Sequence, residues 1–148
     1  MPEVIKIISV VGARPNFMKI APLIHAVEKH NQRPEVGGQR SEAITPPSET
    51  EASLPGHSTP AIRHILVHTG QHYDKKLSES FFEQLNIPQP HHNLNVGSGT
   101  QAEQTGNIMI RYEEILLKEP ADVVLVVGDV TSTMACSIVA KKLNLQVV

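Results

Sequence analysis

Three polar segments follow short apolar runs, and they hold the residue types that could bind an anion or move a proton. They extend from Gly12 to Asn16, from Thr69 to Asp74 and from Gly128 to Thr133. Each carries a glycine at its start, and glycine permits a tight turn and a close approach of backbone to ligand. Arg14 offers a planar guanidinium for phosphate or carboxylate, and Asp129 offers a carboxylate for proton transfer. The pattern predicts a site for a phosphorylated or nucleotide-like ligand.

Each of these residues also has a structural interpretation. Asp129 could cap the helix that follows it, since aspartate is a preferred N-cap residue. Arg14 could be an ordinary surface side chain, and His72 is one of eight histidines in the chain. Position alone leaves these alternatives open. The spacing of the histidines matches no zinc site, so we expect no bound metal.

Two common nucleotide fingerprints are absent from the sequence. No apolar run is followed by Gly-x-Gly-x-x-Gly, and the chain contains no Gly-Lys-Ser/Thr of a phosphate-binding loop. The sequence therefore does not favour a nicotinamide-dependent enzyme, and we expect no cofactor. The segment from Gly97 to Thr100 could bind a phosphate at a helix start or could simply be a flexible loop.

Four apolar runs rich in valine and isoleucine predict the strands that position these segments. They are Val4 to Val11, Ile65 to Val67, Val123 to Val127 and Leu145 to Val148. The third run is apolar throughout, which is typical of a parallel strand covered on both faces. Because helical segments alternate with these runs, we expect an α/β fold, a Rossmann-like parallel sheet with flanking helices. Ligands bind outside the carboxyl ends of such strands, where the three polar segments begin.

Helix start signals occur at Pro15, at Asp74, at Thr100 and at Thr131 or Ser132. Thr100 also has a glutamate three residues later, the spacing of a capping box. The second helix should stop before an Ile-Pro pair and the third before a proline. The expected inward faces are Ile20, Ile24 and Val27; Leu77, Phe81 and Leu85; Ile108, Tyr112, Ile115 and Leu116; and Met134, Ile138 and Val139.

Composition limits the classes of protein and partner. A chain of 148 residues with 40% hydrophobic and 19% charged residues suits one globular domain. The net charge of -2 provides no basic field for nucleic acid or an anionic membrane. The single cysteine, Cys136, cannot form an internal disulfide, and we expect it in the core of a cytoplasmic protein. No apolar stretch is long enough for a membrane span.

One stretch lacks apolar periodicity. Residues 33–64 contain five prolines and three glycines among many polar residues. Loops longer than about 15 residues are usually functional or disordered. We therefore expect residues of about 39–60 to form a mobile insertion.

Four motifs in order resemble one family closely. They are Gly12 to Leu23, Thr69 to Asp74, Val96 to Thr100 and Val127 to Asp129. Together they resemble the non-hydrolysing UDP-N-acetylglucosamine 2-epimerases. The resemblance implies the N-terminal domain of a two-domain, glycosyltransferase-B-type fold that binds a UDP-sugar substrate between its domains. It also implies a cytoplasmic homodimer that interconverts UDP-N-acetylglucosamine and UDP-N-acetylmannosamine for cell-surface polysaccharide synthesis, without metal or nicotinamide.

The resemblance also suggests roles for individual residues. Arg14 and Lys19 would bind the nucleotide end of the substrate, and Asp129 would have an acid/base or supporting role. Gln71 and His72 match a segment that helps bind a second, regulatory UDP-N-acetylglucosamine.

The sequence departs from the family in two ways. The insertion is longer than the usual link to the second strand. The chain also stops at Val148, before the further catalytic carboxylates and the C-terminal nucleotide-binding domain of the family. We therefore expect residues 1–148 to be an N-terminal fragment that is inactive alone. The alternatives are a glycosyltransferase of the same architecture, a hydrolysing epimerase relative and a non-catalytic sugar-nucleotide-binding domain.

Overall fold

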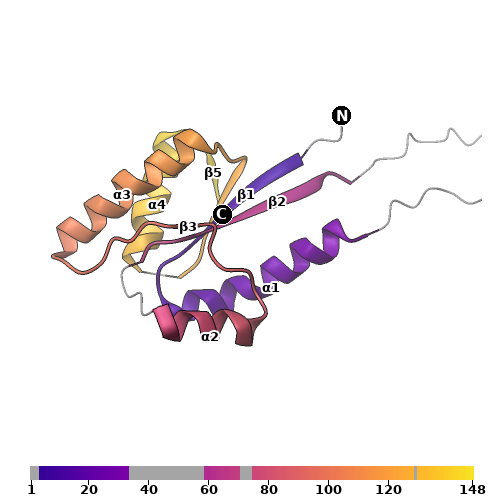
Figure 1. Ribbon diagram of the computed structural model, residues 1–148. Coiled ribbons are helices and arrows are strands. Elements are labelled where there is room, and N and C mark those ends of the chain that lie inside the picture. Colours follow the sequence, from indigo (N-terminus) through magenta and orange to yellow (C-terminus); the bar gives the residue numbers. More distant parts are fainter. Residues whose placement is uncertain (1–3, 34–58, 71–74, 129) are drawn as a thin grey trace, which may run out of the picture.

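A computed structural model describes residues 4–33, 59–70, 75–128 and 130–148, with one parallel sheet at the centre (Figure 1). The sheet has the strand order β3-β2-β1-β4-β5, and every neighbouring pair is parallel. The insertion expected over 39–60 falls almost wholly outside the described residues. The strands are β1 (Val4–Val11), β2 (Ala61–His68), β3 (His92–Asn93), β4 (Val123–Val126) and β5 (Gln146–Val147).

Two layers of helices enclose the sheet (Figure 1). Helices α1 (Arg14–Asn31) and α2 (Lys75–Leu85) lie against one face, and α3 (Gln101–Lys118) and α4 (Thr131–Lys142) lie against the other. Each face encloses its own apolar core, because successive residues of a strand point to opposite faces. The core under α3 and α4 includes Ile8, Val10, Ile108, Tyr112, Leu116, Val124, Ala135 and Cys136. The core under α1 and α2 includes Val11, Phe17, Ile20, Ile24, Leu66, Phe82 and Ile87.

The predicted Rossmann-like parallel sheet is confirmed, and several element boundaries match. Strand β1 has the predicted bounds, and α3 begins after its predicted cap, Thr100. Both arms of the capping box are present: the Glu103 amide donates to Thr100 Oγ1 at 3.2 Å, and the Thr100 amide donates to Glu103 Oε2 at 2.8 Å. Helix α2 ends before the Ile-Pro pair, with Asn86 in the left-handed conformation favoured at a helix end.

The prediction for the inward face of α4 is wrong at two of three positions. Val139 is buried, but Met134 and Ile138 are 53% and 40% exposed. The side chains that face the core are small, which lets α4 pack closely on the sheet. Large apolar residues were given too much weight in the prediction. The buried positions of α4 are Ser132, Ala135, Cys136, Val139 and Ala140.

Two strand predictions also need correction, and one short strand was not predicted. Strand β2 is longer than the predicted Ile65 to Val67, and the two-residue strand β3 is too short to give a sequence pattern. Strand β4 is not covered completely on both faces, since Val124 is its only fully buried residue. In the described residues, α3 and α4 cover one face of β4, whereas Leu125 on the other face borders an open pocket.

Among the described residues, no helix is both long and apolar enough to span a membrane.

Candidate functional site at the carboxyl edge of the sheet

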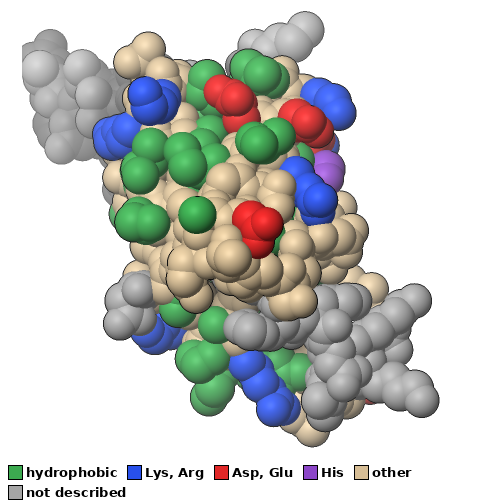
Figure 2. Space-filling view, turned by 90° about the vertical axis from the view of Figure 1, so that its left-hand side faces the viewer, with side chains coloured by type: hydrophobic (Ala, Val, Ile, Leu, Met, Phe, Trp, Pro, Cys, Tyr) green, Lys and Arg blue, Asp and Glu red, His purple; other side chains and the backbone are tan. Residues whose placement is uncertain are grey.

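The carboxyl ends of β1, β2 and β4 lie side by side, as the polar segments that follow them predict. The chain moves from β1 to β2 on one side, and β4 pairs with β1 on the other side. The strand order therefore reverses between β1 and β4. In open parallel sheets, ligands bind in the crevice outside such a reversal. This edge faces the viewer in Figure 2, where uncharged polar side chains and backbone form much of the surface.

Two glycines at this edge allow the backbone to approach neighbouring side chains closely. A Cβ atom on Gly12 would lie 1.8 Å from Ser132 Oγ, and one on Gly128 would lie 2.7 Å from Asn16 Oδ1. Gly128 also has a φ of 90°, which side-chain-bearing residues rarely adopt. Both glycines are therefore needed to bring the start of α1 and the start of α4 together across the ends of β1 and β4.

Buried polar side chains surround this junction. Asn16, Thr69 and Ser132 are all nearly inaccessible to solvent. The hydroxyls of Thr69 and Ser132 are 3.5 Å apart, so β2 and α4 meet through polar groups at this point. The amide nitrogen Nδ2 of Asn16 has no hydrogen-bond partner among the described residues. Buried polar groups are usually paired, and an exception calls for a physical explanation.

The turn between β4 and α4 is fixed on its α4 side. The Thr133 hydroxyl donates to the Val127 carbonyl at 3.1 Å, and the Thr133 amide donates to the Val130 carbonyl at 3.0 Å. Asn16 packs against Gly128 from the α1 side. The turn therefore lies between two helix starts, each of which contacts it through a polar residue.

The starts of α1 and α4 differ from the start of α3. The N-cap residues Ala13 and Val130 provide no side-chain hydrogen bond, and neither helix has an acidic residue in its first turn. The Thr100 capping box, by contrast, satisfies the start of α3 internally. Free amide groups at a helix start favour an anion. The edge therefore has two helix starts whose electrostatics suit a negatively charged ligand.

The structure places Arg14 and Lys19 on α1, and both side chains are exposed. The Arg14 guanidinium lies 4.7 Å from the centre of the Phe81 ring of α2, a cation–π contact. Arg14 is thus held at the carboxyl edge between α1 and α2. Asp129, Gln71 and His72 lie outside the described residues, so the structure places none of these three predicted site residues.

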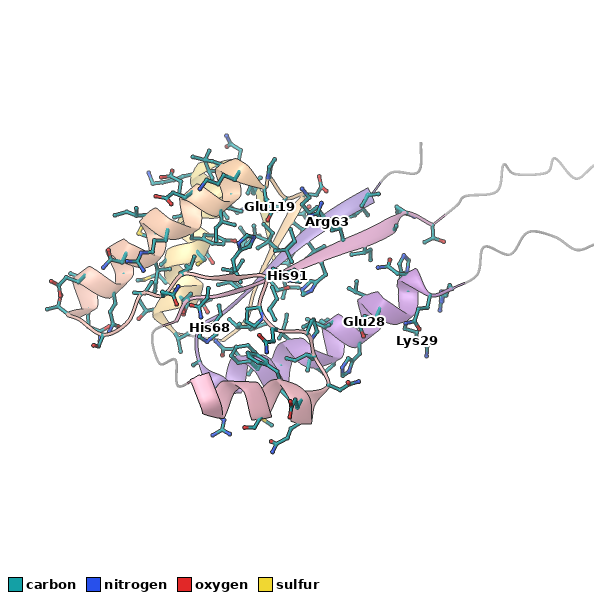
Figure 3. All side chains as sticks on the ribbon, in the orientation of Figure 1. Glu28, Lys29, Arg63, His68, His91 and Glu119 are labelled. Atoms are coloured by element: carbon teal, nitrogen blue, oxygen red, sulfur yellow. The ribbon has the colours of Figure 1, made fainter. Side chains whose placement is uncertain are left out.

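His68 ends β2 and is buried beneath α1 and α2 (Figure 3). Its ring stacks on Phe17 with centroids 5.3 Å apart. Burial lowers the pKa of His68 to about 4, and a hydrogen bond with Asn93 partly opposes this shift. The imidazole is therefore neutral at pH 7 and supports the packing of this edge.

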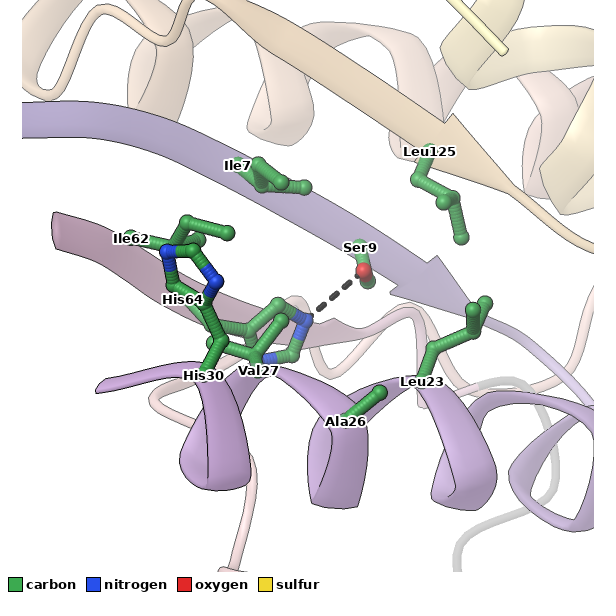
Figure 4. Close-up of a pocket in the computed structure, with 9 residues that line it drawn as sticks. All are labelled: Ile7, Ser9, Leu23, Ala26, Val27, His30, Ile62, His64 and Leu125. Carbon is green, nitrogen blue, oxygen red and sulfur yellow. Dashed lines mark hydrogen bonds between the residues drawn. The ribbon is translucent and has the colours of Figure 1, made fainter. Parts of the chain in front are cut away.

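A separate pocket of about 270 Å³ lies between α1 and the sheet, away from the strand ends (Figure 4). Its lining is mostly apolar and includes Ile7, Val27 and Leu125. Ser9, His30 and His64 form its polar part, and His64 Nε2 lies 2.8 Å from Ser9 Oγ. Arg14 and Lys19, the predicted site residues that the structure describes, do not line this pocket. In the described residues, no three histidine, cysteine or acidic side chains form a metal-binding group.

Sequence reasoning included Asn16, Thr69, Ser132 and Thr133 in the three polar segments but gave none of them a role of its own in the site. A signal for Asn16 was present, since it precedes the inward-facing Ile20 by one helical turn. A polar residue on the apolar face of a helix needs a special reason. No comparable signal identifies Ser132, because its role depends on contact with β1, more than a hundred residues earlier in the chain.

Comparison with known proteins assigns the chain to a family. A family model described as UDP-N-acetylglucosamine 2-epimerase matches residues 56–148. The chain belongs to the UDP-N-acetylglucosamine 2-epimerase family. The predicted resemblance is thereby confirmed at the level of the family.

Individual relatives that resemble this chain are also named as 2-epimerases. The UDP-N-acetylglucosamine 2-epimerase of Methanocaldococcus jannaschii is 37% identical over 142 residues, which are 96% of this chain and 31% of that protein. A UDP-N-acetylglucosamine 2-epimerase homolog of Methanococcus maripaludis is 38% identical with the same coverage. The UDP-2,3-diacetamido-2,3-dideoxy-D-glucuronate 2-epimerase of Pseudomonas aeruginosa is 34% identical, covering 96% of this chain and 32% of that protein.

Solved structures of this epimerase family have the same fold. The M. jannaschii UDP-GlcNAc 2-epimerase in complex with UDP-GlcNAc and UDP matches with a TM-score of 0.73 at 37% identity. The match covers 97% of this chain and 31% of that chain. The chain therefore spans about a third of the length of these relatives, in agreement with the predicted place of the Rossmann-like sheet within a larger glycosyltransferase-B-type fold.

Proposed function

We propose that the whole protein containing this chain is a non-hydrolysing UDP-N-acetylglucosamine 2-epimerase. It interconverts UDP-N-acetylglucosamine and UDP-N-acetylmannosamine for cell-surface polysaccharide synthesis in the cytoplasm. The chain belongs to this family, and the observation that carries the proposal is the position of Arg14 at the carboxyl edge of the sheet. Arg14 begins α1 there, and the N-cap residue of this helix provides no side-chain hydrogen bond. Residues 1–148 make up about a third of such a protein and are inactive alone.

The UDP diphosphate binds at the start of α1. Arg14 and Lys19 supply positive charge on this helix, and the positive end of the helix dipole lies at its start. The first turn of α1 contains no acidic residue that would repel the ligand. A clamp on the diphosphate also stabilises the charge that develops when UDP departs.

Asp129 takes part in proton transfer at the sugar. Removal of the C2 proton and cleavage of the C1–O bond give 2-acetamidoglucal and UDP. Re-addition of UDP to C1, with a proton delivered to the other face of C2, gives the epimer. Such chemistry needs both an acid and a base. Asp129 follows the Gly128 turn directly in the sequence, at the end of a central strand.

Further parts of the proposal follow the family resemblance. Gln71 and His72 help bind a second, regulatory UDP-N-acetylglucosamine beside the substrate. They follow Gly70, which continues the central strand β2 at the same edge. The active protein is a homodimer.

Product analysis of the whole protein in deuterated water tests the proposal. With UDP-N-acetylglucosamine and no acceptor, we expect UDP-N-acetylmannosamine with deuterium at C2. Transfer of the sugar only when an acceptor is added would indicate a glycosyltransferase. Free N-acetylmannosamine with UDP would indicate a hydrolysing epimerase. Binding without turnover would indicate a sugar-nucleotide-binding protein.

The 34% identity to the P. aeruginosa enzyme supports a second candidate sugar. That relative is a 2-epimerase of UDP-2,3-diacetamido-2,3-dideoxy-D-glucuronate. The same assay with both sugar nucleotides separates the two candidates, because kcat/KM measures discrimination between substrates. A preference for the diacetamido sugar would keep the reaction type and change the substrate.

A further inference from the structure

We propose that two copies of the whole protein associate through the outer face of α3 and α4, with α3 of one copy over α4 of the other. This inference rests on the proposed function, which includes a homodimer, and it gives that dimer its surface. In the described residues, half of the exposed large hydrophobic side chains lie on these two helices, and each of them is at least 40% exposed. They are Ile110, Leu117, Met134 and Ile138.

Each of the two helices carries an exposed stripe on the side opposite its buried stripe. Ile110 follows the buried Ile108 by two residues, which is a rotation of about 200° around the helix. Met134 precedes the buried Cys136 by the same step. Positions i, i+4 and i+7 share one side of a helix, and both exposed stripes have this spacing. The outer stripes are Ile110, Glu114 and Leu117 on α3 and Met134, Ile138 and Lys141 on α4.

The two outer stripes belong to one surface, because α3 and α4 pack side by side on the same face of the sheet (Figure 1). Single exposed hydrophobic residues are ordinary, but a contiguous apolar patch marks an interaction site. Helices of 18 and 12 residues are about 27 and 18 Å long and about 10 Å wide, which gives a flat area of about 450 Å². A standard interface buries about 800 Å² of accessible surface on each partner. The helix pair therefore supplies more than half of such an interface.

The charges within the stripes favour a second copy of the same chain as the occupant of this surface. The stripe on α3 contains the carboxylate of Glu114, and the stripe on α4 contains the ammonium group of Lys141. Neither group forms an ion pair with another described residue. A two-fold interface uses the same surface patch on both copies, so α3 over α4 of the partner brings the two opposite charges together twice. The surface is therefore complementary to itself in charge as well as apolar.

A further helix of the same domain is a less suitable occupant. Strand β5 lies at the edge of the sheet, next to β4. A right-handed crossover from β5 to another parallel strand would put its helix on the α3 and α4 side of the sheet, beside α4. Such a helix packs on the sheet and leaves the outer stripe of α4 uncovered. The outer stripes therefore lie one layer beyond the helices that cover the sheet.

Sedimentation equilibrium of the whole protein tests the surface. We expect the parent to be a dimer, and we expect Met134→Glu and Ile110→Glu each to raise the dimer Kd at least about tenfold, because a carboxylate would be buried against apolar surface without a partner. Met18 of α1 is the matched control, since it is an exposed methionine on the helix layer at the other face of the sheet. Met18→Glu should leave the dimer Kd within about twofold of the parent. Thermal melts check that each variant is folded.

A charge exchange tests the placement of α3 over α4 of the partner. Glu114→Lys alone and Lys141→Glu alone put like charges together in the interface, and each should raise the dimer Kd about threefold or more. The variant with both changes restores opposite charges across the interface, so its Kd should return to within about twofold of the parent. A general effect of surface charge on stability would not produce this recovery.

The outcomes separate this inference from the proposed reaction. A parent that epimerises as a monomer overturns the inference and leaves the reaction standing, and so does a dimer that Met134→Glu and Ile110→Glu leave intact. A monomer whose Tm these variants lower would show that the rest of its own chain covers the stripes, which also overturns the inference. Dissociation without recovery in the charge exchange overturns the placement of α3 over α4. A dimer that behaves as expected but forms no UDP-N-acetylmannosamine supports the surface and contradicts the proposed function.

Discussion

Helix α1 carries an asparagine near each end, and the two side chains have opposite surroundings. Asn31 is exposed, yet both ends of its amide are bonded to Ile62. Asn16 is buried, yet its Nδ2 has no hydrogen-bond partner in the part of the chain that the structure describes. Hydrogen bonds that hold a fold together are normally completed within it. An unpaired donor at a buried position therefore calls for a physical explanation.

A similar contrast in hydrogen bonding exists between the amino edge of the sheet, where the strands begin, and the carboxyl edge, where they end. At the amino edge, the Lys6 amide donates to Asp122 Oδ2 at 2.8 Å, and Glu119 accepts from Arg63 at 3.4 Å and pairs with His92 at 2.7 Å. These contacts tie strands and helix ends to one another (Figure 3). At the carboxyl edge, two helix starts lack side-chain caps. The amino edge is therefore held by side-chain bonds, and the carboxyl edge is where we propose that the ligand binds.

The largest expected effect is that of Asp129→Asn on turnover. If Asp129 transfers a proton or holds the group that does, kcat in the whole protein should fall about a hundredfold or more. Asparagine caps a helix about as well as aspartate, so a capping role alone would leave kcat nearly unchanged. Deuterium incorporation at C2 and a thermal melt measure the two effects separately.

Two glycine-to-alanine variants, one at the carboxyl edge and one in α3, should change the free energy of unfolding in opposite directions. Gly12→Ala puts a methyl group 1.8 Å from Ser132 Oγ and should cost about 1–3 kcal/mol of unfolding free energy. Gly106 lies in α3 with open space around it, and Gly106→Ala should stabilise the protein by about 0.5–1 kcal/mol. Urea unfolding of both variants gives the comparison. Equal effects would show that the carboxyl edge is not tightly packed.

Arginines at the two edges should differ in their effect on ligand binding. Arg14→Ala should weaken UDP-N-acetylglucosamine binding by about 1.5 kcal/mol, because a charge-assisted hydrogen bond to phosphate is lost. Arg63 pairs with Glu119 at the amino edge, so Arg63→Ala should leave affinity unchanged. Calorimetry on the whole protein measures both. If Arg14→Ala binds with the parental affinity, Arg14 is an ordinary surface residue beside Phe81.

The strands and helices that form the carboxyl edge could be predicted from the sequence more completely than the side-chain contacts within it. Apolar runs and cap signals were enough to predict the parallel sheet, β1 and α3, because these elements follow local patterns. The meeting of Gly12 with Ser132 could not be predicted, since it depends on contact across the fold. Met134 and Ile138 were placed inside with Val139, but the buried stripe of α4 is shifted toward Ala135 and Cys136. Their actual exposure shows that phase decides which side of α4 packs.

A smaller effect should appear in the pH dependence of stability. Burial lowers the folded-state pKa of His64 and of His68 to about 4, from 6.5; the charge of His91 adds to the shift at His64. Between these values the unfolded state binds more protons, so stability should fall as the pH drops from 6.5 toward 4. Thermal melts of a variant with both His64→Gln and His68→Gln should show a shallower decline. An unchanged slope would assign the acid sensitivity to other groups.

Hydrogen–deuterium exchange on the whole protein, with and without UDP-N-acetylglucosamine, tests the difference between the two edges most directly. Bound ligand should slow amide exchange in the first turns of α1 and α4 and in the turn around Gly128, because those amides gain a partner or lose access to water. Exchange around Asn31, Ile62 and Asp122 should not change. Protection confined to the amino edge, or absent from both edges at saturating ligand, would contradict a sugar-nucleotide site at the carboxyl ends of these strands.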